Sequence, residues 1–89
     1  MNQVTLYGTN RCPFCIQAER LLQRKGVVPH KINIDNDDAL EEEMIKRSGR
    51  RTVPQIFIGD LHVGGYDDLS ALDRLGKLDA LLRAEKVGS

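Results

Sequence analysis

The sequence predicts an α/β fold in which a mixed four-stranded sheet is flanked by helices. The first half of the chain reads as strand, helix, strand, helix, because short alternating apolar runs are followed by segments with apolar residues every three or four positions. The second half contains two apolar runs joined by Gly59-Asp60, which is typical of a β-hairpin. A strand–helix–strand order favours parallel pairing, whereas a hairpin is antiparallel, so the predicted sheet is mixed.

The first strand is expected over residues 3–7 and the first helix over residues from about 13 to 25. This helix is predicted to end there because Arg24 and Lys25 supply positive charge in its last turn and Gly26 follows. Four apolar side chains of the helix are expected to face the core: Ile16, Ala18, Leu21 and Leu22.

A second strand is expected over residues 30–34, with both of its isoleucines on one face. A second helix is expected over residues 38–48. Asp38 can cap this helix, with Glu41 three residues further on as in a capping box, and Gly49 ends it.

The hairpin is expected to pair a strand that begins at Pro54 with a strand at 61–63, since a proline at the start of a strand removes no central ladder bond. An aspartate after Tyr66 is expected to cap a third helix, which Gly76 ends, and a short fourth helix follows. The leucines expected on the apolar faces of these two helices are Leu69, Leu72, Leu75, Leu78, Leu81 and Leu82.

The composition indicates one domain, residues 1–89, without an excess of charge. Thirteen basic and thirteen acidic side chains cancel, so no global field favours a nucleic acid or a membrane surface as partner. No apolar run is long enough to span a bilayer, and the chain starts without an apolar signal region. We therefore expect a cytoplasmic protein, with a monomer as the default oligomeric state.

The stretch Cys12-Pro13-Phe14-Cys15 contains the only two cysteines of the chain and lies between the first strand and the first helix. Cys12 is expected at the N-cap, where unpaired backbone N–H groups and the helix dipole stabilise a thiolate, and Arg11 adds a positive charge. We expect the pKa of the Cys12 thiol in the range of roughly 3.5 to 7.5. Cys15 lies on the same helical face and points inward. This spacing predicts an exposed attacking thiol and a sheltered resolving thiol.

Two other uses of the cysteine pair explain the sequence less well. A zinc site usually needs a second cysteine pair or histidines at fixed spacing, whereas His30 and His62 are isolated. A structural disulfide between residues three apart would close a loop too small to restrain much of the unfolded chain. Redox catalysis without a bound metal is therefore the favoured interpretation.

Two further segments are candidates for binding a substrate. If the bond between Val53 and Pro54 is cis, the Val53 backbone can pair with an extended, peptide-like thiol, although an isolated X-Pro bond is usually trans. In Gly64-Gly65-Tyr66-Asp67-Asp68 a helix N-terminus suits a carboxylate, and the aspartate that does not cap the helix can hold an ammonium group. Arg11 and Arg51 can pair with another carboxylate. Together these groups suit a small ligand with two carboxylates, one ammonium and a central thiol.

Three motifs also carry a resemblance to a known family. The chain resembles the glutaredoxins along nearly its whole length, through Cys12-Pro13-Phe14-Cys15, Arg51-Thr52-Val53-Pro54 and Gly64-Gly65-Tyr66-Asp67-Asp68. The stretch from Glu42 to Ile58 looks most like the short bacterial dithiol glutaredoxins of the glutaredoxin 3 type. All three motifs in this order are highly specific.

The resemblance implies a thioredoxin-like fold, a cis bond before Pro54 and glutathione as the reducing ligand. By this analogy Cys12 is the nucleophile and Cys15 resolves its disulfide, while Thr52 and Val53 pair with the cysteinyl part of glutathione. The groups implied for the two ends of glutathione are Tyr66, Asp67 and Asp68 for the γ-glutamyl end and Arg51 for the glycyl carboxylate.

Two positions depart from the family pattern. Thr9 stands where many relatives carry a lysine, which leaves Arg11 as the nearest positive charge to Cys12. Phe14 stands where a tyrosine is commoner, which keeps an aromatic lip without its hydroxyl. We expect Phe14 at the rim of the site rather than in the core.

The function implied is a glutathione-dependent thiol–disulfide oxidoreductase that reduces protein disulfides and glutathionylated proteins, with ribonucleotide reductase a substrate candidate at the family level. Its potential is expected at about −200 to −230 mV, in the range of glutaredoxins. One alternative is an iron–sulfur carrier that uses Cys12 and glutathione. Relatives specialised for that role usually have Gly-Phe-Ser after the first cysteine, and this chain does not. The other alternative is a redoxin reduced by a thioredoxin reductase.

Overall fold

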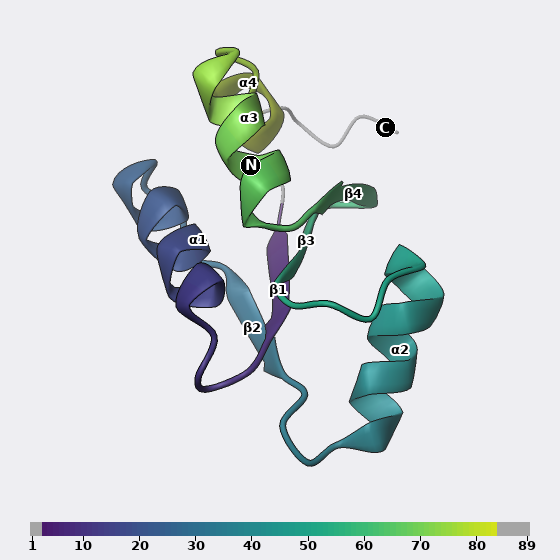
Figure 1. Ribbon diagram of the computed structural model, residues 1–89. Helices are drawn as coiled ribbons and strands as arrows, with labels where there is room; N and C mark the ends of the chain where they lie inside the picture. The colour runs from purple at the N-terminus through teal and green to yellow at the C-terminus, as the bar shows by residue number, and fades with distance from the viewer. Residues whose placement is uncertain (1–2, 84–89) are drawn as a thin grey trace.

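The computed structural model describes residues 3–83, which form a four-stranded sheet between two layers of helices (Figure 1). In chain order the elements are β1 (Val4–Gly8), α1 (Pro13–Arg24), β2 (His30–Asn33), α2 (Asp38–Ser48), β3 (Gln55–Ile58), β4 (Leu61–Gly64), α3 (Tyr66–Arg74) and α4 (Leu78–Arg83). The strand order is β2-β1-β3-β4, with β1 parallel to β2 and antiparallel to β3, and β3 antiparallel to β4. The predicted mixed sheet is confirmed.

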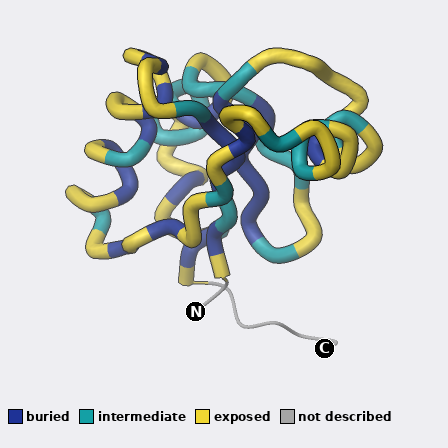
Figure 2. The backbone as a smooth tube through the Cα atoms, turned by 90° about the horizontal axis from the view of Figure 1, so that it is seen from below, coloured by how far each residue is buried: buried dark blue, intermediate teal, exposed yellow. Residues whose placement is uncertain are grey.

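Each face of the sheet has its own hydrophobic cluster, because side chains alternate along a strand. Leu6 of β1 packs in the larger cluster, which is completed by side chains of α1, α3 and α4. Its neighbour Tyr7 faces the other way and packs with Phe57 and with Met44 of α2. The buried stretches therefore run through the middle of the molecule, while the outer sides of the helices are exposed (Figure 2).

Two of the predicted core residues lie at the surface. Ile16 is 45% exposed, because the buried face of α1 is set by Cys15, Ala18 and Leu22, and Ile16 lies about 100° around the helix from Cys15. Leu75 is 67% exposed and is the C-cap of α3, one residue beyond the last helical residue, Arg74. The prediction was wrong at both positions.

The cap of α2 is also one residue earlier than predicted. The Asp37 carboxylate accepts the backbone N–H of Leu40 at 3.0 Å, so Asp37 is the N-cap and Asp38 is the first helical residue. Both aspartates still lie where the helix dipole favours negative charge. Gly49 ends the helix in the left-handed conformation at φ 73°, as a glycine there allows.

Candidate active site

Cys12 is the N-cap of α1, as predicted, and Pro13 is the first helical residue. The Cys12 sulfur accepts the backbone N–H of Cys15 at 3.1 Å, and the Cys12 carbonyl accepts the N–H of Ile16 at 3.2 Å. A side chain at this position meets the free N–H groups and the positive end of the helix dipole. The site therefore supplies the donors that a thiolate at Cys12 needs.

The prediction that Cys12 is exposed was wrong, because this residue is only 7% exposed. The segment before Pro54 lies against it, and the Cys12 thiol donates to the Val53 carbonyl at 3.8 Å. Two stretches that are 41 residues apart in the chain are thus in contact at the attacking sulfur. The Val53–Pro54 bond is cis, as the resemblance implied.

Cys15 lies beneath Cys12 and is sheltered, as predicted. It is buried against β1, where Gly8 leaves room for its sulfur. Burial, together with the hydrogen bond to Cys12, raises the pKa of the Cys15 thiol to about 12. Both cysteines are free thiols, and Cys15 is neutral at physiological pH.

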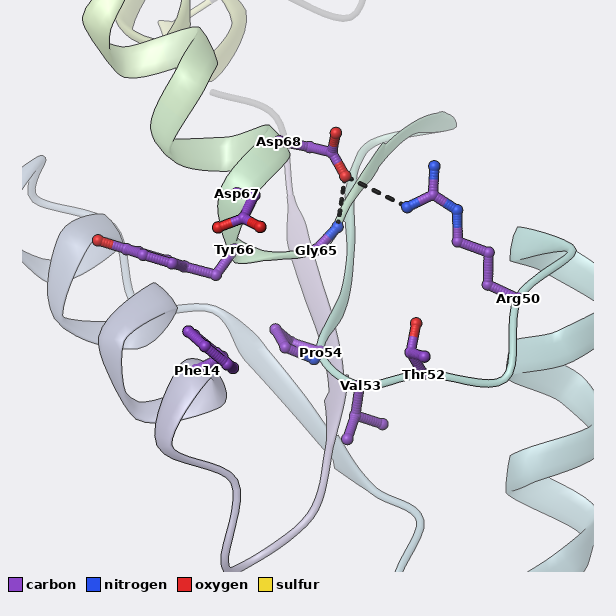
Figure 3. Close-up of a pocket in the computed structure, with 9 residues that line it drawn as sticks. All are labelled: Phe14, Arg50, Thr52, Val53, Pro54, Gly65, Tyr66, Asp67 and Asp68. Atoms are coloured by element: carbon purple, nitrogen blue, oxygen red, sulfur yellow. Dashed lines mark hydrogen bonds and ion pairs between the residues drawn. The ribbon is translucent and has the colours of Figure 1, made fainter.

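A groove of about 210 Å³ is lined by Val53, the residue that contacts Cys12, and by its neighbours Thr52 and Pro54 (Figure 3). The rings of Phe14 and Tyr66 stack at one side of it, with centroids 6.2 Å apart and planes inclined by 23°. Phe14 is 54% exposed, so the predicted rim position is confirmed. The groove is lined by Phe14, Arg50, Thr52, Val53, Pro54, Gly65, Tyr66, Asp67 and Asp68.

The N-terminus of α3 closes the groove opposite the Thr52–Pro54 segment. An aspartate was predicted to cap α3 from the N-cap position, but the N-cap is Gly65. The Asp68 carboxylate, three residues further on, accepts the backbone N–H of Gly65 at 3.0 Å. The same oxygen accepts from Arg50 at 3.2 Å. The Gly65 N–H lowers the pKa of Asp68; burial opposes this shift, and Arg50 lowers the pKa further. Asp67 takes no part in this cap.

Six of the sequence-predicted binding residues line the groove, and two do not. Arg51 lies on the other side of the loop and lines a separate pocket beside α2, with Glu41, Glu42 and Lys46. The six that line the groove are Thr52, Val53, Pro54, Tyr66, Asp67 and Asp68.

Arg11 is exposed in the loop before α1 and does not line the groove either. Arg50, which the sequence analysis missed, is the basic residue that does. Two adjacent arginines in a loop point in different directions, and the sequence pattern does not indicate which one faces the groove.

Neither a cluster for a metal nor a membrane span is present in the part of the chain that the structure describes. Among residues 3–83, no three His, Cys, Asp or Glu side chains lie close enough together to hold a metal ion. Between the same limits, no helix combines the length and the apolar surface needed to cross a bilayer.

Comparison with known proteins connects this geometry to one family. The glutaredoxin family profile matches residues 4–63. A glutaredoxin of Pseudomonas aeruginosa is 55% identical over 84 residues, which cover 94% of this chain and 100% of the relative. Glutaredoxin 3 of Escherichia coli K12 is 54% identical over 83 residues, with 93% of this chain and 100% of the relative covered.

A solved structure agrees with these sequence matches. The crystal structure of a buckwheat glutaredoxin–glutathione complex superimposes with a TM-score of 0.83 at 31% identity, over 91% of this chain and 76% of that one. The predicted thioredoxin-like fold is therefore confirmed.

Proposed function

The chain belongs to the glutaredoxin family and is a glutathione-dependent thiol–disulfide oxidoreductase, and from this premise we propose that it reduces glutathione mixed disulfides and protein disulfides through Cys12 and Cys15. The observation that carries the proposal is the contact between the Cys12 sulfur and the Val53 carbonyl, 3.8 Å apart, at the end of the groove-lining segment. A peptide-like thiol that pairs with this segment would bring its sulfur to Cys12.

The reaction with a glutathionylated protein takes two exchanges. The Cys12 thiolate attacks the glutathione sulfur, a Cys12–glutathione disulfide forms, and the protein thiolate leaves and takes up a proton. A second glutathione thiolate then attacks the bound glutathione sulfur, which releases glutathione disulfide and returns the Cys12 thiolate. Cys15 is not required in this route, and its neutral thiol does not compete as a nucleophile.

A protein disulfide needs the second cysteine. Cys12 attacks one sulfur of the substrate disulfide and forms a mixed disulfide with it, while the other substrate sulfur leaves as a thiolate. Cys15 then attacks the Cys12 sulfur, the second substrate thiolate leaves and takes up the Cys15 proton, and a Cys12–Cys15 disulfide remains. Two molecules of glutathione reduce that disulfide and leave as glutathione disulfide.

We assign the groups around the groove to the parts of glutathione. Thr52 and Val53, before the cis Pro54, take the cysteinyl part by backbone pairing. Arg50 replaces Arg51 as the partner of the glycyl carboxylate, because Arg50 lines the groove and Arg51 does not. The γ-glutamyl end is assigned to the turn at Tyr66, Asp67 and Asp68, whose side chains line the groove. Arg11 keeps the role of a positive charge in the loop before Cys12.

The partners and setting that we propose follow from the same chemistry. The substrates are proteins with disulfides or glutathionylated cysteines, and ribonucleotide reductase is one candidate. A cytoplasmic location fits a pair of free thiols that are reduced by glutathione. We propose that residues 1–89 form a single glutaredoxin domain. The domain acts as a monomer, since one chain supplies every residue assigned to the site. Residues 1–2 and 84–89 of this domain lie outside the described part.

A glutathione-coupled assay on a glutathionylated peptide tests the proposal. We expect Cys12→Ser to abolish turnover and Cys15→Ser to retain it, while both variants lose the reduction of protein disulfides. Wild-type protein that is inactive with glutathione but active with a thioredoxin reductase would contradict the assignment of the groove. A brown, visibly absorbing protein after anaerobic reconstitution with iron and sulfide would instead support an iron–sulfur carrier.

A further inference from the structure

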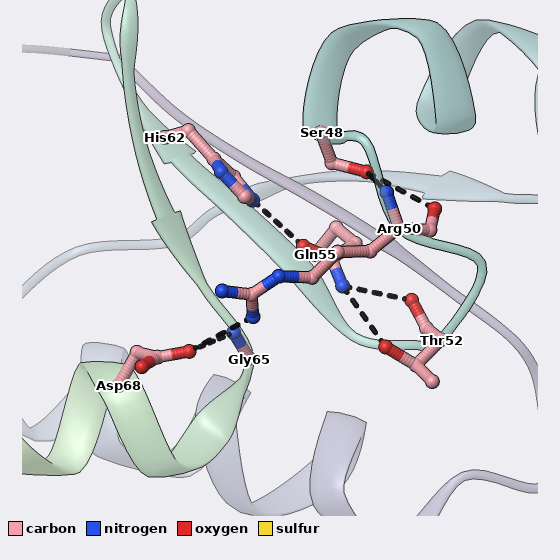
Figure 4. Close-up of polar contacts among 7 residues, drawn as sticks. All are labelled: Ser48, Arg50, Thr52, Gln55, His62, Gly65 and Asp68. Carbon is pink, nitrogen blue, oxygen red and sulfur yellow. Dashed lines mark hydrogen bonds and ion pairs between the residues drawn. The ribbon is translucent and has the colours of Figure 1, made fainter.

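One buried polar side chain lies directly behind the groove. Gln55, at the start of β3, is 0% exposed in an otherwise apolar strand. Burying an amide is costly unless its hydrogen bonds are made, so the partners of Gln55 indicate what it is used for. Those partners are Thr52, which lines the groove, and His62 of β4 (Figure 4).

The Gln55 amide makes two hydrogen bonds to Thr52. Its Nε2 donates to the Thr52 carbonyl oxygen at 3.0 Å and to the Thr52 hydroxyl oxygen at 3.2 Å. A carbonyl oxygen can only accept, so the amide nitrogen must be the atom that faces Thr52. Both amide hydrogens are then used on this one residue, and Oε1 points the other way.

His62 donates a hydrogen bond to Gln55, which in turn donates to Thr52, so the donors along this chain of residues all point the same way. Its Nε2 lies 2.7 Å from Gln55 Oε1, which can only accept, so Nε2 carries the hydrogen. The His62 ring packs against Phe57 with centroids 4.9 Å apart, which holds the ring in place. Burial lowers the pKa of His62; Arg50 lowers it further, and Asp68 raises it. Because Nε2 keeps its hydrogen in both charge states, the contact does not depend on the protonation of His62.

The bond to the Thr52 carbonyl fixes the direction of the next N–H group. The Thr52 carbonyl and the Val53 N–H belong to one planar peptide unit, and in a trans unit they point in opposite directions. Since the carbonyl points at the buried Gln55, the Val53 N–H points away from Gln55. The Thr52 hydroxyl oxygen accepts from Gln55 as well, which leaves the hydroxyl hydrogen for another acceptor.

We propose that Gln55 and His62 are positioning residues that hold the Thr52–Val53 peptide so that its N–H group meets the glutathionyl part of the substrate. This inference rests on the proposed function, because it takes Thr52 and Val53 as the segment that pairs with glutathione. Neither residue touches the substrate: His62 orients the Gln55 amide, and Gln55 orients the peptide.

Gln55→Met tests the role of the amide, because methionine has nearly the same shape and no N–H donor. We expect KM for a glutathionylated peptide to rise about three- to tenfold, the effect of losing one or two ordered hydrogen bonds. We expect kcat to change less than twofold, since Cys12 and Cys15 are untouched and the loss is one of binding. If Gln55→Met only lost stability, its melting temperature would fall, but KM would not rise while kcat stayed nearly constant.

Tyr7→Phe is the matched control for stability. Tyr7 is the direct neighbour of Gln55 across β1 and β3, is equally buried, and its hydroxyl bonds to Glu43 and Arg47 of α2 rather than to Thr52. This variant removes polar contacts from the same face of the sheet. We expect it to lower the melting temperature and to leave KM within twofold of wild type.

His62→Phe keeps an aromatic ring beside Phe57 and removes the donor to Gln55. We expect a smaller rise in KM, about two- to threefold, because the Gln55 amide loses only one of its anchors. If both residues act through one chain, Gln55→Met/His62→Phe has the same KM as Gln55→Met alone. Independent, multiplying effects would overturn the part assigned to His62.

The outcomes separate this inference from the proposed function. Wild-type protein without glutathione-dependent turnover would overturn the proposed function, and the positioning role with it. Active wild-type protein with KM unchanged in Gln55→Met would overturn the positioning role alone. If Gln55→Met does not fold, the partly exposed His62→Phe decides the matter: an unchanged KM there would overturn the inference, and a raised KM would support it.

Discussion

Gly8 lies directly against the sulfur of Cys15: a Cβ built on Gly8 would be 2.8 Å from that sulfur and 3.2 Å from the side chain of Leu6. Contacts below about 3 Å force one of the groups to move, and neither the strand nor the buried first turn of α1 has room to do so. The lack of a side chain at the end of β1 is therefore what lets the resolving cysteine pack under Cys12.

We predict that Gly8→Ala lowers the free energy of unfolding by about 1–3 kcal/mol, the usual cost of overpacking a core. Unfolding in urea of the reduced protein measures this. Cys15→Ala removes the sulfur that the new Cβ would meet, so Gly8→Ala should cost clearly less in the Cys15→Ala background than in wild type. An equal cost in both backgrounds would show that the sulfur contact is not the cause.

The two thiols should differ sharply in their reaction with alkylating agents. Because burial raises the pKa of Cys15 to about 12, this thiol is protonated at pH 7–9 and a poor nucleophile. We predict that iodoacetamide at pH 7.5 modifies only Cys12 in the folded reduced protein, and that Cys15 reacts after unfolding in urea. Peptide mass spectrometry identifies the labelled residue. Equal labelling of both cysteines in the folded protein would contradict the burial-based assignment.

The sequence predicted the fold well because the signals for it are local. Period-two and helical patterns, a Gly-Asp turn and glycines after helices lie within a few residues of each other, and they indicated all eight elements found within residues 3–83. The wrong predictions concern positions at which the surrounding structure, rather than the local sequence, determines which residue caps a helix or which side chain is buried. Whether Asp37 or Asp38 caps α2 depends on how the chain enters the helix, and the exposure of Ile16 depends on which face α1 turns to the sheet.

The site could be predicted in part for the same reason. The spacing of Cys12 and Cys15 indicated redox chemistry directly, but the burial of Cys12 depends on a segment that is 41 residues away in the chain. The choice between Arg50 and Arg51 depends on the twist of one loop. Gln55 was also missed, although a polar residue inside the apolar run around β3 was a visible signal for a buried hydrogen-bonding role.

Arg50 and Arg51 offer a test in which the change in charge is the same. Arg50 lines the groove and pairs with Asp68, whereas Arg51 faces a different pocket. We predict that Arg50→Ala raises KM for a glutathionylated peptide about tenfold, as expected for one hydrogen bond to a charged group. Arg51→Ala should change KM less than twofold. Equal effects of the two variants would indicate a general electrostatic attraction, which high salt would abolish.

The carboxylate of Asp68 links the stability of the α3 cap to pH. The Gly65 N–H and Arg50 both lower its pKa in the folded protein, despite the opposing effect of burial. A carboxyl with a lowered folded pKa contributes stability that is present above its unfolded pKa and is lost as the pH falls through the folded value. The contribution is small, about 0.5 kcal/mol, because water screens this half-exposed group.

Asp68→Asn keeps an oxygen that can accept from Gly65 and removes only the charge. We predict that the variant is less stable than wild type in urea at pH 7, and that the two unfolding curves converge near pH 2, where the wild-type carboxyl is protonated as well. Asp67→Asn is the matched control, since Asp67 lies in the same first turn of α3 and loses the same charge but takes no part in the cap, so it should lose clearly less stability at pH 7 than Asp68→Asn. A gap between wild type and Asp68→Asn that persists unchanged at pH 2 would mean that the side-chain amide, and not the missing charge, weakens the start of α3.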